Sequence, residues 1–437
     1  MRLSRRAAAA IAIGTWAALG ALPPPPLQAG SSPTYRLLKQ DVIVNADVWG
    51  RRPKMMAAGL GFTNIIGVPG ITTDDLARSE QLVRAAGGAW NTIACASGES
   101  PTLAAYTSAS TPQQVANAYG HPTTLSDGLP VEFSWPIRPS TLDPTDFRIT
   151  FNTGRVVVPE LASIYPNEEY NERSVAVLFG TFGNRLPSGA PGAEYPVLSR
   201  VVRDKTPLQL VGPNDRIVSA VGFRASAATS PYDDPDASLA ERTGPRLVAA
   251  KLTRLSTRGE NAPAPFRVAL PNDGRTLYGS QARFRLRVYT SGGFSPDGVR
   301  PVFPTDFSRY FRLHARGRVH DIVLSATNHT YRIAGHALRI LGLADLGPKQ
   351  PQYDDCYRED KDNYIDIVIA GEADAVSRIT SVEIPAAGAY SPFFNPGGPG
   401  NDPTSGTPYT SPGPSQLEPV WVTLDNPMTV TFVRAAR

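Results

Sequence analysis

From Leu129 onward, apolar and polar residues alternate with a period of two, and this pattern constrains the fold more than any other feature. In residues 131–135 and 147–151, valine, isoleucine, phenylalanine or tryptophan occupies every second position. Successive side chains of a strand point to opposite faces, so each segment is expected to be a strand with one buried face. Further apolar segments follow at residues 156–158, 175–179, 197–202 and 208–211. Short strands separated by turns rich in proline, glycine and asparagine predict an antiparallel β-sandwich.

Part of this region resembles a known family. It contains an apolar strand, a short proline turn, an S/T-L-x-P segment and a phenylalanine that leads the next strand: Val131-Glu132-Phe133, Pro136-Ile137, Ser140-Thr141-Leu142-Asp143-Pro144 and Phe147-Arg148-Ile149. A later strand entry contains Leu186-Pro187, Gly189 and Tyr195. Over residues 129–211 these motifs resemble bacterial Ig-like modules of the S-layer type. The resemblance implies an Ig-like sandwich with a structural or adhesive role, and it carries over no catalytic residues.

Residues 1–29 have the three-part pattern of a secretory signal peptide. Residues 1–6 include three arginines, residues 7–22 form an apolar run, and residues 23–26 are prolines, with cleavage expected before Gly30. The alternative is a membrane anchor, but a spanning helix needs about 20 apolar residues. We therefore expect a periplasmic or secreted protein without stable membrane insertion after cleavage.

The charge distribution of the chain indicates which kinds of molecule it can bind. The formal net charge is +4, and removal of the three arginines at the N-terminus leaves a nearly neutral chain. No stripe dense in lysine and arginine and interleaved with aromatic residues follows, which argues against nucleic acid. The expected partner is an extracellular ligand or protein that the sequence does not identify.

The chain has two cysteines, Cys95 and Cys356. In an oxidising compartment an even pair can close one bridge. The alternative is a pair of buried free thiols. We predict a disulfide that joins the N-terminal and C-terminal regions.

Composition and pattern divide the mature chain into three parts. These are a mixed loop and helix region at 30–125, the Ig-like sandwich at 126–224, and a second β-rich domain at 225–437 with a Pro/Gly-rich loop at 385–419. Helix start and stop signals predict two short helices in the first part, at residues 72–86 and 111–120. At the C-terminus, alternating apolar residues on both sides of Asp425-Asn426-Pro427 predict a hairpin.

The densest group of carboxylates lies in a loop that leads into an apolar strand at residues 365–369. Its members are Asp354, Asp355, Glu359, Asp360, Asp362 and Asp366. Hard oxygen ligands at this density suit Ca²⁺, which takes six to eight oxygens. The spacing is not that of an EF-hand, and Arg358 and Lys361 can neutralise the carboxylates, so the alternative is a solvated acidic turn.

No motif names a reaction. The sequence lacks G-x-S-x-G, S-x-x-K and a glycine-rich phosphate loop. His314 and His320 flank a predicted hairpin, where a three-residue turn would place them opposite each other and a two-residue turn would not. A structural role is favoured for both because no zinc motif accompanies them. The sequence thus favours an exported β-sandwich protein with a binding or structural role, stabilised by calcium, and the alternative is a secreted hydrolase with a loop-built site.

Overall fold

The computed structural model describes most of the chain, and the predicted signal peptide lies outside the described residues. The described residues are 32–59, 61–95, 101–184, 186, 190–227, 246–257, 274–293, 295, 299–385 and 415–434. Pro187, Gly189 and residues 386–414 of the Pro/Gly-rich loop also lie outside them.

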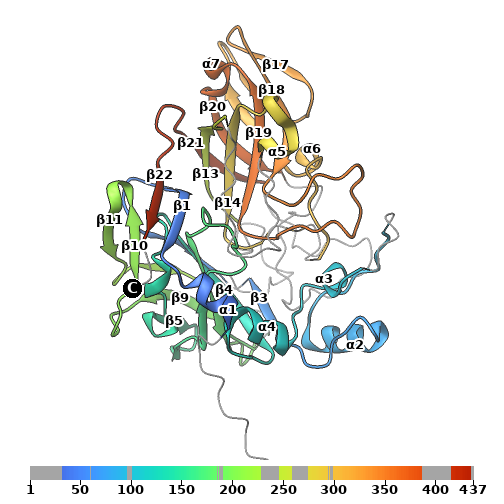
Figure 1. Ribbon diagram of the computed structural model, residues 1–437, viewed down its shortest axis with the longest axis vertical. Coiled ribbons are helices and arrows are strands. Elements are labelled where there is room, and N and C mark those ends of the chain that lie inside the picture. Colours follow the sequence, from blue (N-terminus) through green and yellow to red (C-terminus); the bar gives the residue numbers. More distant parts are fainter. Residues whose placement is uncertain are drawn as a thin grey trace, which may run out of the picture.

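Two antiparallel sheets form one half of the molecule, and we call them the paired sheets (Figure 1). The first contains β2 (Met55–Ala58), β4 (Ser126–Phe133), β8 (Val175–Gly180) and β7 (Leu161–Ser163), with β3 (Phe62–Ile66) also paired to β4. The second contains β12 (Arg224–Ser226), β9 (Pro196–Val201), β5 (Phe147–Phe151) and β6 (Val156–Val157). A separate hairpin is formed by β10 (Gln209–Gly212) and β11 (Arg216–Ser219).

The alternation in the sequence creates the core of the paired sheets. Val131 and Phe133 of β4, Ile149 of β5, Leu178 of β8 and Val201 of β9 share one buried cluster. In β5 every second residue is buried, as the period of two predicts. The mainly β, antiparallel character that the sequence predicted is therefore confirmed.

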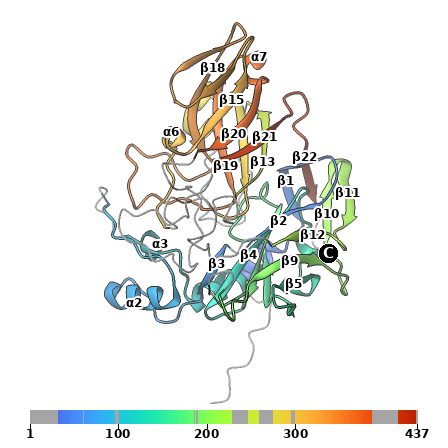
Figure 2. The same ribbon diagram turned by 180° about the vertical axis from the view of Figure 1, so that it is seen from behind.

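A nine-stranded sheet forms the other half, and we call it the curled sheet because it bends into a nearly closed, barrel-like shape (Figures 1 and 2). Its strands, in order, are β16 (Asp321–Leu324), β15 (Arg312–Arg316), β20 (Ile379–Ile384), β21 (Gln416–Val422), β13 (Leu247–Arg254), β14 (Phe284–Thr290), β19 (Tyr364–Gly371), β18 (His336–Ala344) and β17 (Thr330–Ile333). Only β13 and β21 pair in parallel among these neighbours. Leu286, Leu313 and Ile367 belong to a single core inside the curl.

The helices are short and lie outside the sheets. The α-helices are α1 (Pro33–Leu38), α2 (Leu76–Ala86), α3 (Leu103–Tyr106), α4 (Pro112–Tyr119), α5 (Gly274–Tyr278), α6 (Phe307–Tyr310) and α7 (Ala373–Val376). The 3-10 turns are η1 (Pro139–Thr141), η2 (Pro144–Asp146), η3 (Pro213–Asp215) and η4 (Gly279–Gln281). Both helices predicted in residues 30–125 are present, since Asp75 caps α2 and Thr111 forms a capping box at α4. This region also contributes three strands that the pattern did not indicate.

The predicted C-terminal hairpin is wrong. Its first segment is β21, which pairs with β13 and β20 in the curled sheet. Its second segment is β22 (Thr429–Val433), which pairs with β1 (Val42–Asp47) beside the paired sheets. Residues 423–428 therefore cross from one half of the molecule to the other.

Candidate functional site

A buried layer of charged side chains lies between the curled sheet and the paired sheets. It begins on the outer face of the curled sheet, where Lys251, Arg287 and Asp366 are successive cross-strand partners on β13, β14 and β19. Their neighbours Leu286 and Ile367 point into the curl. The amphipathic pattern of β14 therefore places Arg285 and Arg287 on a face that the other half of the molecule covers.

Asp47, at the end of β1, binds three cations of the curled sheet. Its carboxylate lies 2.6 Å from Lys251 Nζ, 2.9 Å from Arg285 Nη2 and 3.5 Å from Arg287 Nη1. Burial alone would raise the pKa of Asp47, but Arg285, Lys251 and Arg287 together lower it well below the usual value. Arg287 also forms a bidentate pair with Asp366, at 2.7 and 3.0 Å, and contacts Asp345 at 2.5 Å. These contacts join β1 to the curled sheet.

Beside this network lies a cluster of five carboxylates, four of them buried and Asp360 partly buried, which we call the acidic cluster. It consists of Glu169, Glu172, Asp345, Asp360 and Asp362. One oxygen of each of Glu169, Glu172 and Asp345 lies within 4.8 Å of the other two, and all three side chains are buried. Burial and the nearby Glu172 carboxylate raise the pKa of Glu169 to about 11. The same two causes raise the pKa of Asp362 well above its usual value.

Backbone hydrogen bonds orient two members of the acidic cluster. Glu172 Oε2 accepts a hydrogen bond from the Glu169 N–H at 3.0 Å, and Asp362 Oδ1 accepts one from the Tyr364 N–H at 2.7 Å. No N–H or hydroxyl group among the described residues donates to the other oxygen of either carboxylate, although Glu172 is 2% and Asp362 4% exposed. Buried polar atoms are rarely left in this state. Carboxylate oxygens are the ligands that a hard divalent cation prefers.

The six carboxylates proposed from the sequence do not lie together. Asp354 accepts a hydrogen bond from the Cys356 N–H, Asp355 accepts one from the Ala94 N–H, and Glu359 accepts one from the Val302 N–H. Asp366 pairs with Arg287. Asp360 and Asp362 alone join the acidic cluster.

Sequence reasoning missed three members of the acidic cluster. Glu169 and Glu172 lie in a segment between β7 and β8, and Asp345 directly follows β18. The run Glu168-Glu169-Tyr170-Asn171-Glu172 is itself dense in acidic groups, which is a signal the sequence contained. Its distance from residue 345 along the chain concealed the contact.

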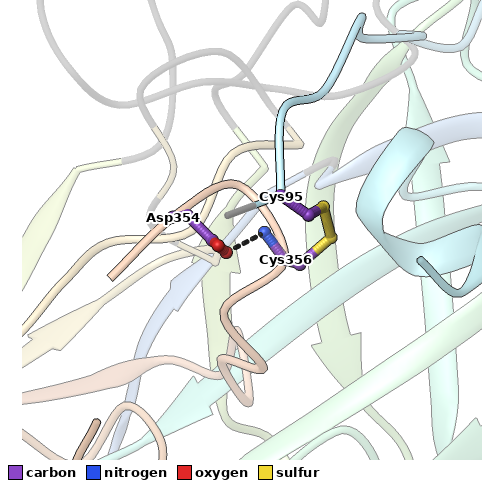
Figure 3. Close-up of side chains that lie close together, drawn as sticks. All are labelled: Cys95, Asp354 and Cys356. Carbon is purple, nitrogen blue, oxygen red and sulfur yellow. Dashed lines mark hydrogen bonds between the residues drawn. A yellow bond between two sulfur atoms is a disulfide. The ribbon is translucent and has the colours of Figure 1, made fainter. Parts of the chain in front are cut away.

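The two cysteines form the predicted disulfide (Figure 3). Cys95 and Cys356 have Cα atoms 5.5 Å apart and are separated by 261 residues in sequence. The Cys356 N–H donates to Asp354 Oδ1 at 2.9 Å, so the bridge and this carboxylate share one turn. The bridge ties the segment after α2 to the loop that carries Asp360 and Asp362.

A cleft of about 590 Å³ lies next to the acidic cluster. Its aromatic lining residues are Phe62, Tyr119, Tyr165 and Phe179. Glu168, Glu359, Asp360 and Lys361 also line it. Burial, with the Glu172 carboxylate, raises the pKa of Glu168 to about 7. Among the described residues that line this cleft there is no histidine.

His314, His320 and His336 lie on the curled sheet or in its turns. His314 pairs across the strands with Val323, and His320 lies in the four-residue turn between β15 and β16, so neither predicted turn length is correct. His314 Nε2 lies 2.7 Å from Glu383 Oε2, and His336 Nδ1 lies 2.9 Å from Glu372 Oε2. The first pair joins β15 to β20. The second joins the start of β18 to Glu372, which directly follows β19. Neither pair includes a member of the acidic cluster.

Comparisons with family models, curated proteins and solved structures gave no match to this chain. None of the helices in the described residues has the length and apolar character needed to cross a membrane.

Proposed function

We propose that this chain is an exported, extracytoplasmic binding protein whose ligand occupies the cleft beside the acidic cluster. The cleft is the observation that carries the proposal, because ligand sites are concave and largely apolar with a few fixed polar groups. The paired sheets, proposed here to be an Ig-like sandwich, supply Phe62 and Phe179 to its wall. The disulfide is compatible with the periplasmic or secreted location that we propose.

The lining indicates the chemistry of the ligand. The aromatic side chains suit an apolar body, and aromatic faces also attract cations. Glu168, Glu359 and Asp360 contribute carboxylates, whereas Lys361 contributes the lining ammonium group and donates from it to the Val299 carbonyl oxygen. Glu168, which is largely ionised at pH 8, favours a ligand with an apolar body and one cationic group.

The first prediction concerns 3-phenylpropylamine and its neutral counterpart 3-phenylpropanol, compared by titration calorimetry. We expect the amine to bind several-fold more tightly at pH 8, and the preference to shrink in Glu168→Gln. Glu168 must be ionised to attract the amine, and its pKa in the folded protein is about 7. The preference should therefore also fall as the pH is lowered from 8 to 6.

Two further variants complete this test. Ala104→Trp places a large side chain at an exposed position of the cleft lining and should abolish binding of both compounds. Glu80→Gln, on the outer surface of α2, should leave both affinities unchanged. Equal affinity for the two compounds, or unchanged binding by Ala104→Trp, would contradict the proposal.

A further inference from the structure

The acidic cluster has more negative charge than its ion pairs neutralise. Of its five carboxylates, Asp345 alone forms an ion pair within the described residues, with Arg287. The adjacent guanidinium of Arg173 is fully buried, but its hydrogen bonds go to the carbonyl oxygens of Val42 and Asn167. An isolated buried carboxylate is too costly to remain ionised without a partner. The cluster must therefore hold either protons or a cation.

We propose that the acidic cluster is a calcium site, in which Glu172, Asp362, Asp345 and Glu169 supply oxygen ligands and Asp360 lies at the side facing the cleft. Two observations favour an ion over protons alone. The oxygens of Glu169, Glu172 and Asp345 converge to within 4.8 Å of one another. In addition, Glu172 and Asp362 each use one oxygen for a backbone N–H, which fixes the carboxylate, and no N–H or hydroxyl group among the described residues donates to the other.

The number and type of ligands favour calcium over magnesium. Calcium takes six to eight oxygens in flexible geometry, whereas magnesium demands a near-ideal octahedron and keeps several waters. Five carboxylates from separate segments of the chain, four of them buried, match the coordination that calcium prefers. The site differs from the loop proposed from the sequence, because it needs Glu169, Glu172 and Asp345 and does not use Asp354 or Asp355.

The position of the site gives the ion a structural role. Glu169 and Glu172 belong to the segment between β7 and β8 of the paired sheets. In the curled sheet, Asp345 directly follows β18, and Asp362 lies just before β19. An ion bound by both pairs would join the two halves of the molecule. Removal of the ion would leave the boundary without this connection.

The second prediction tests the site with the whole mature protein, after chelation and then with calcium chloride. We expect 1 mM calcium to raise Tm by roughly 3 °C or more, which corresponds to a site of about 10 μM affinity. Magnesium chloride at the same concentration should raise Tm less.

Glu172→Gln and Asp362→Asn separate loss of the site from loss of the fold. Each replaces a carboxyl group that needs a proton or a cation with a neutral amide of nearly the same shape, so the calcium-free variant should melt at the same temperature as the chelated wild-type protein or higher. The rise with calcium should disappear. The matched controls are Asp354→Asn and Asp355→Asn in the same loop, which should keep the rise.

Three results would overturn the proposal. The first is a wild-type Tm that calcium does not change. The second is a calcium effect that persists in Glu172→Gln and Asp362→Asn. The third is an effect lost in Asp354→Asn and Asp355→Asn instead, which would assign calcium to the exposed part of the loop. None of these results depends on the ligand proposed for the cleft.

Discussion

Arg287 and Asp47 each contact three oppositely charged side chains of the buried charged layer. Arg287 contacts Asp366, Asp345 and Asp47, and it comes from the middle of a strand whose seven residues are all buried. Buried guanidinium groups need partners on several sides, because their fixed donors cannot be satisfied by water. Arg287 obtains them from β19, from the end of β18 and from β1.

The third prediction is that Arg287→Ala lowers the free energy of unfolding by about 3–5 kcal/mol. Removal of one member of a buried charge network leaves the remaining carboxylates without compensation. Arg283→Ala is the matched control, since Arg283 lies four residues earlier and is exposed. Urea unfolding of both variants measures the difference, and equal losses would show that the network does not stabilise the fold.

In residues 283–288 arginine alternates with an apolar residue, which indicates an amphipathic strand but does not show that the arginines of β14 are buried. Alternation reveals two faces of a strand and says nothing about what covers the polar one. The partner Asp47 lies more than two hundred residues away along the chain. The acidic cluster escaped prediction for the same reason, because Glu172 and Asp345 meet only when the two halves pack together.

At the scale of elements, local sequence signals predicted the two helices correctly, whereas the pairing of strands distant in sequence was not predicted. The caps at Asp75 and Thr111 depend on hydrogen bonds three residues apart, and both helices start where expected. The hairpin at the C-terminus failed because a turn signal at Asp425-Asn426 does not decide whether the flanking strands pair with each other. Instead, β22 pairs with β1, and β21 pairs with β13 of the curled sheet.

The fourth prediction concerns the pairing of β22 with β1. Val430 of β22 is 3% exposed and belongs to the core of the paired sheets, whereas Val433 of the same strand is 63% exposed. Val430→Ala should lower the free energy of unfolding by about 2 kcal/mol through lost burial and the cavity left behind. Val433→Ala should change it by less than about 0.5 kcal/mol. Thermal unfolding of the two variants distinguishes them, and similar effects would mean that β22 does not contribute to the core.

At the scale of the whole molecule, three kinds of contact connect the two halves. They are the charge network centred on Asp47, the stacked rings of Trp49, Tyr289 and Tyr364, and the strand crossing at residues 423–428. The Tyr289 hydroxyl also donates to the Ser174 carbonyl oxygen at 3.0 Å. We therefore expect the halves to unfold together.

The fifth prediction concerns the disulfide. Because Cys95 and Cys356 close a loop of more than 250 residues, reduction should lower the free energy of unfolding by about 2–5 kcal/mol. The double variant Cys95→Ser/Cys356→Ser should show the same loss and no further response to reductant. A reductant effect that persists in the double variant would show that the loss has another cause.

The pairing of β1 with β22 has a consequence for the order in which the chain can mature. Asn45 donates its backbone N–H to Thr431 Oγ1 across 386 residues of sequence. A polypeptide that emerges from a ribosome or a translocation channel exposes β1 first and β22 almost last. Until nearly the entire polypeptide has emerged, β1 lacks its partner strand, and the backbone groups at that edge of β1 lack their hydrogen bonds to β22. The fold is therefore completed only when nearly the entire chain is available, and a chain stalled before β22 would present the open edge of β1 to proteases and chaperones.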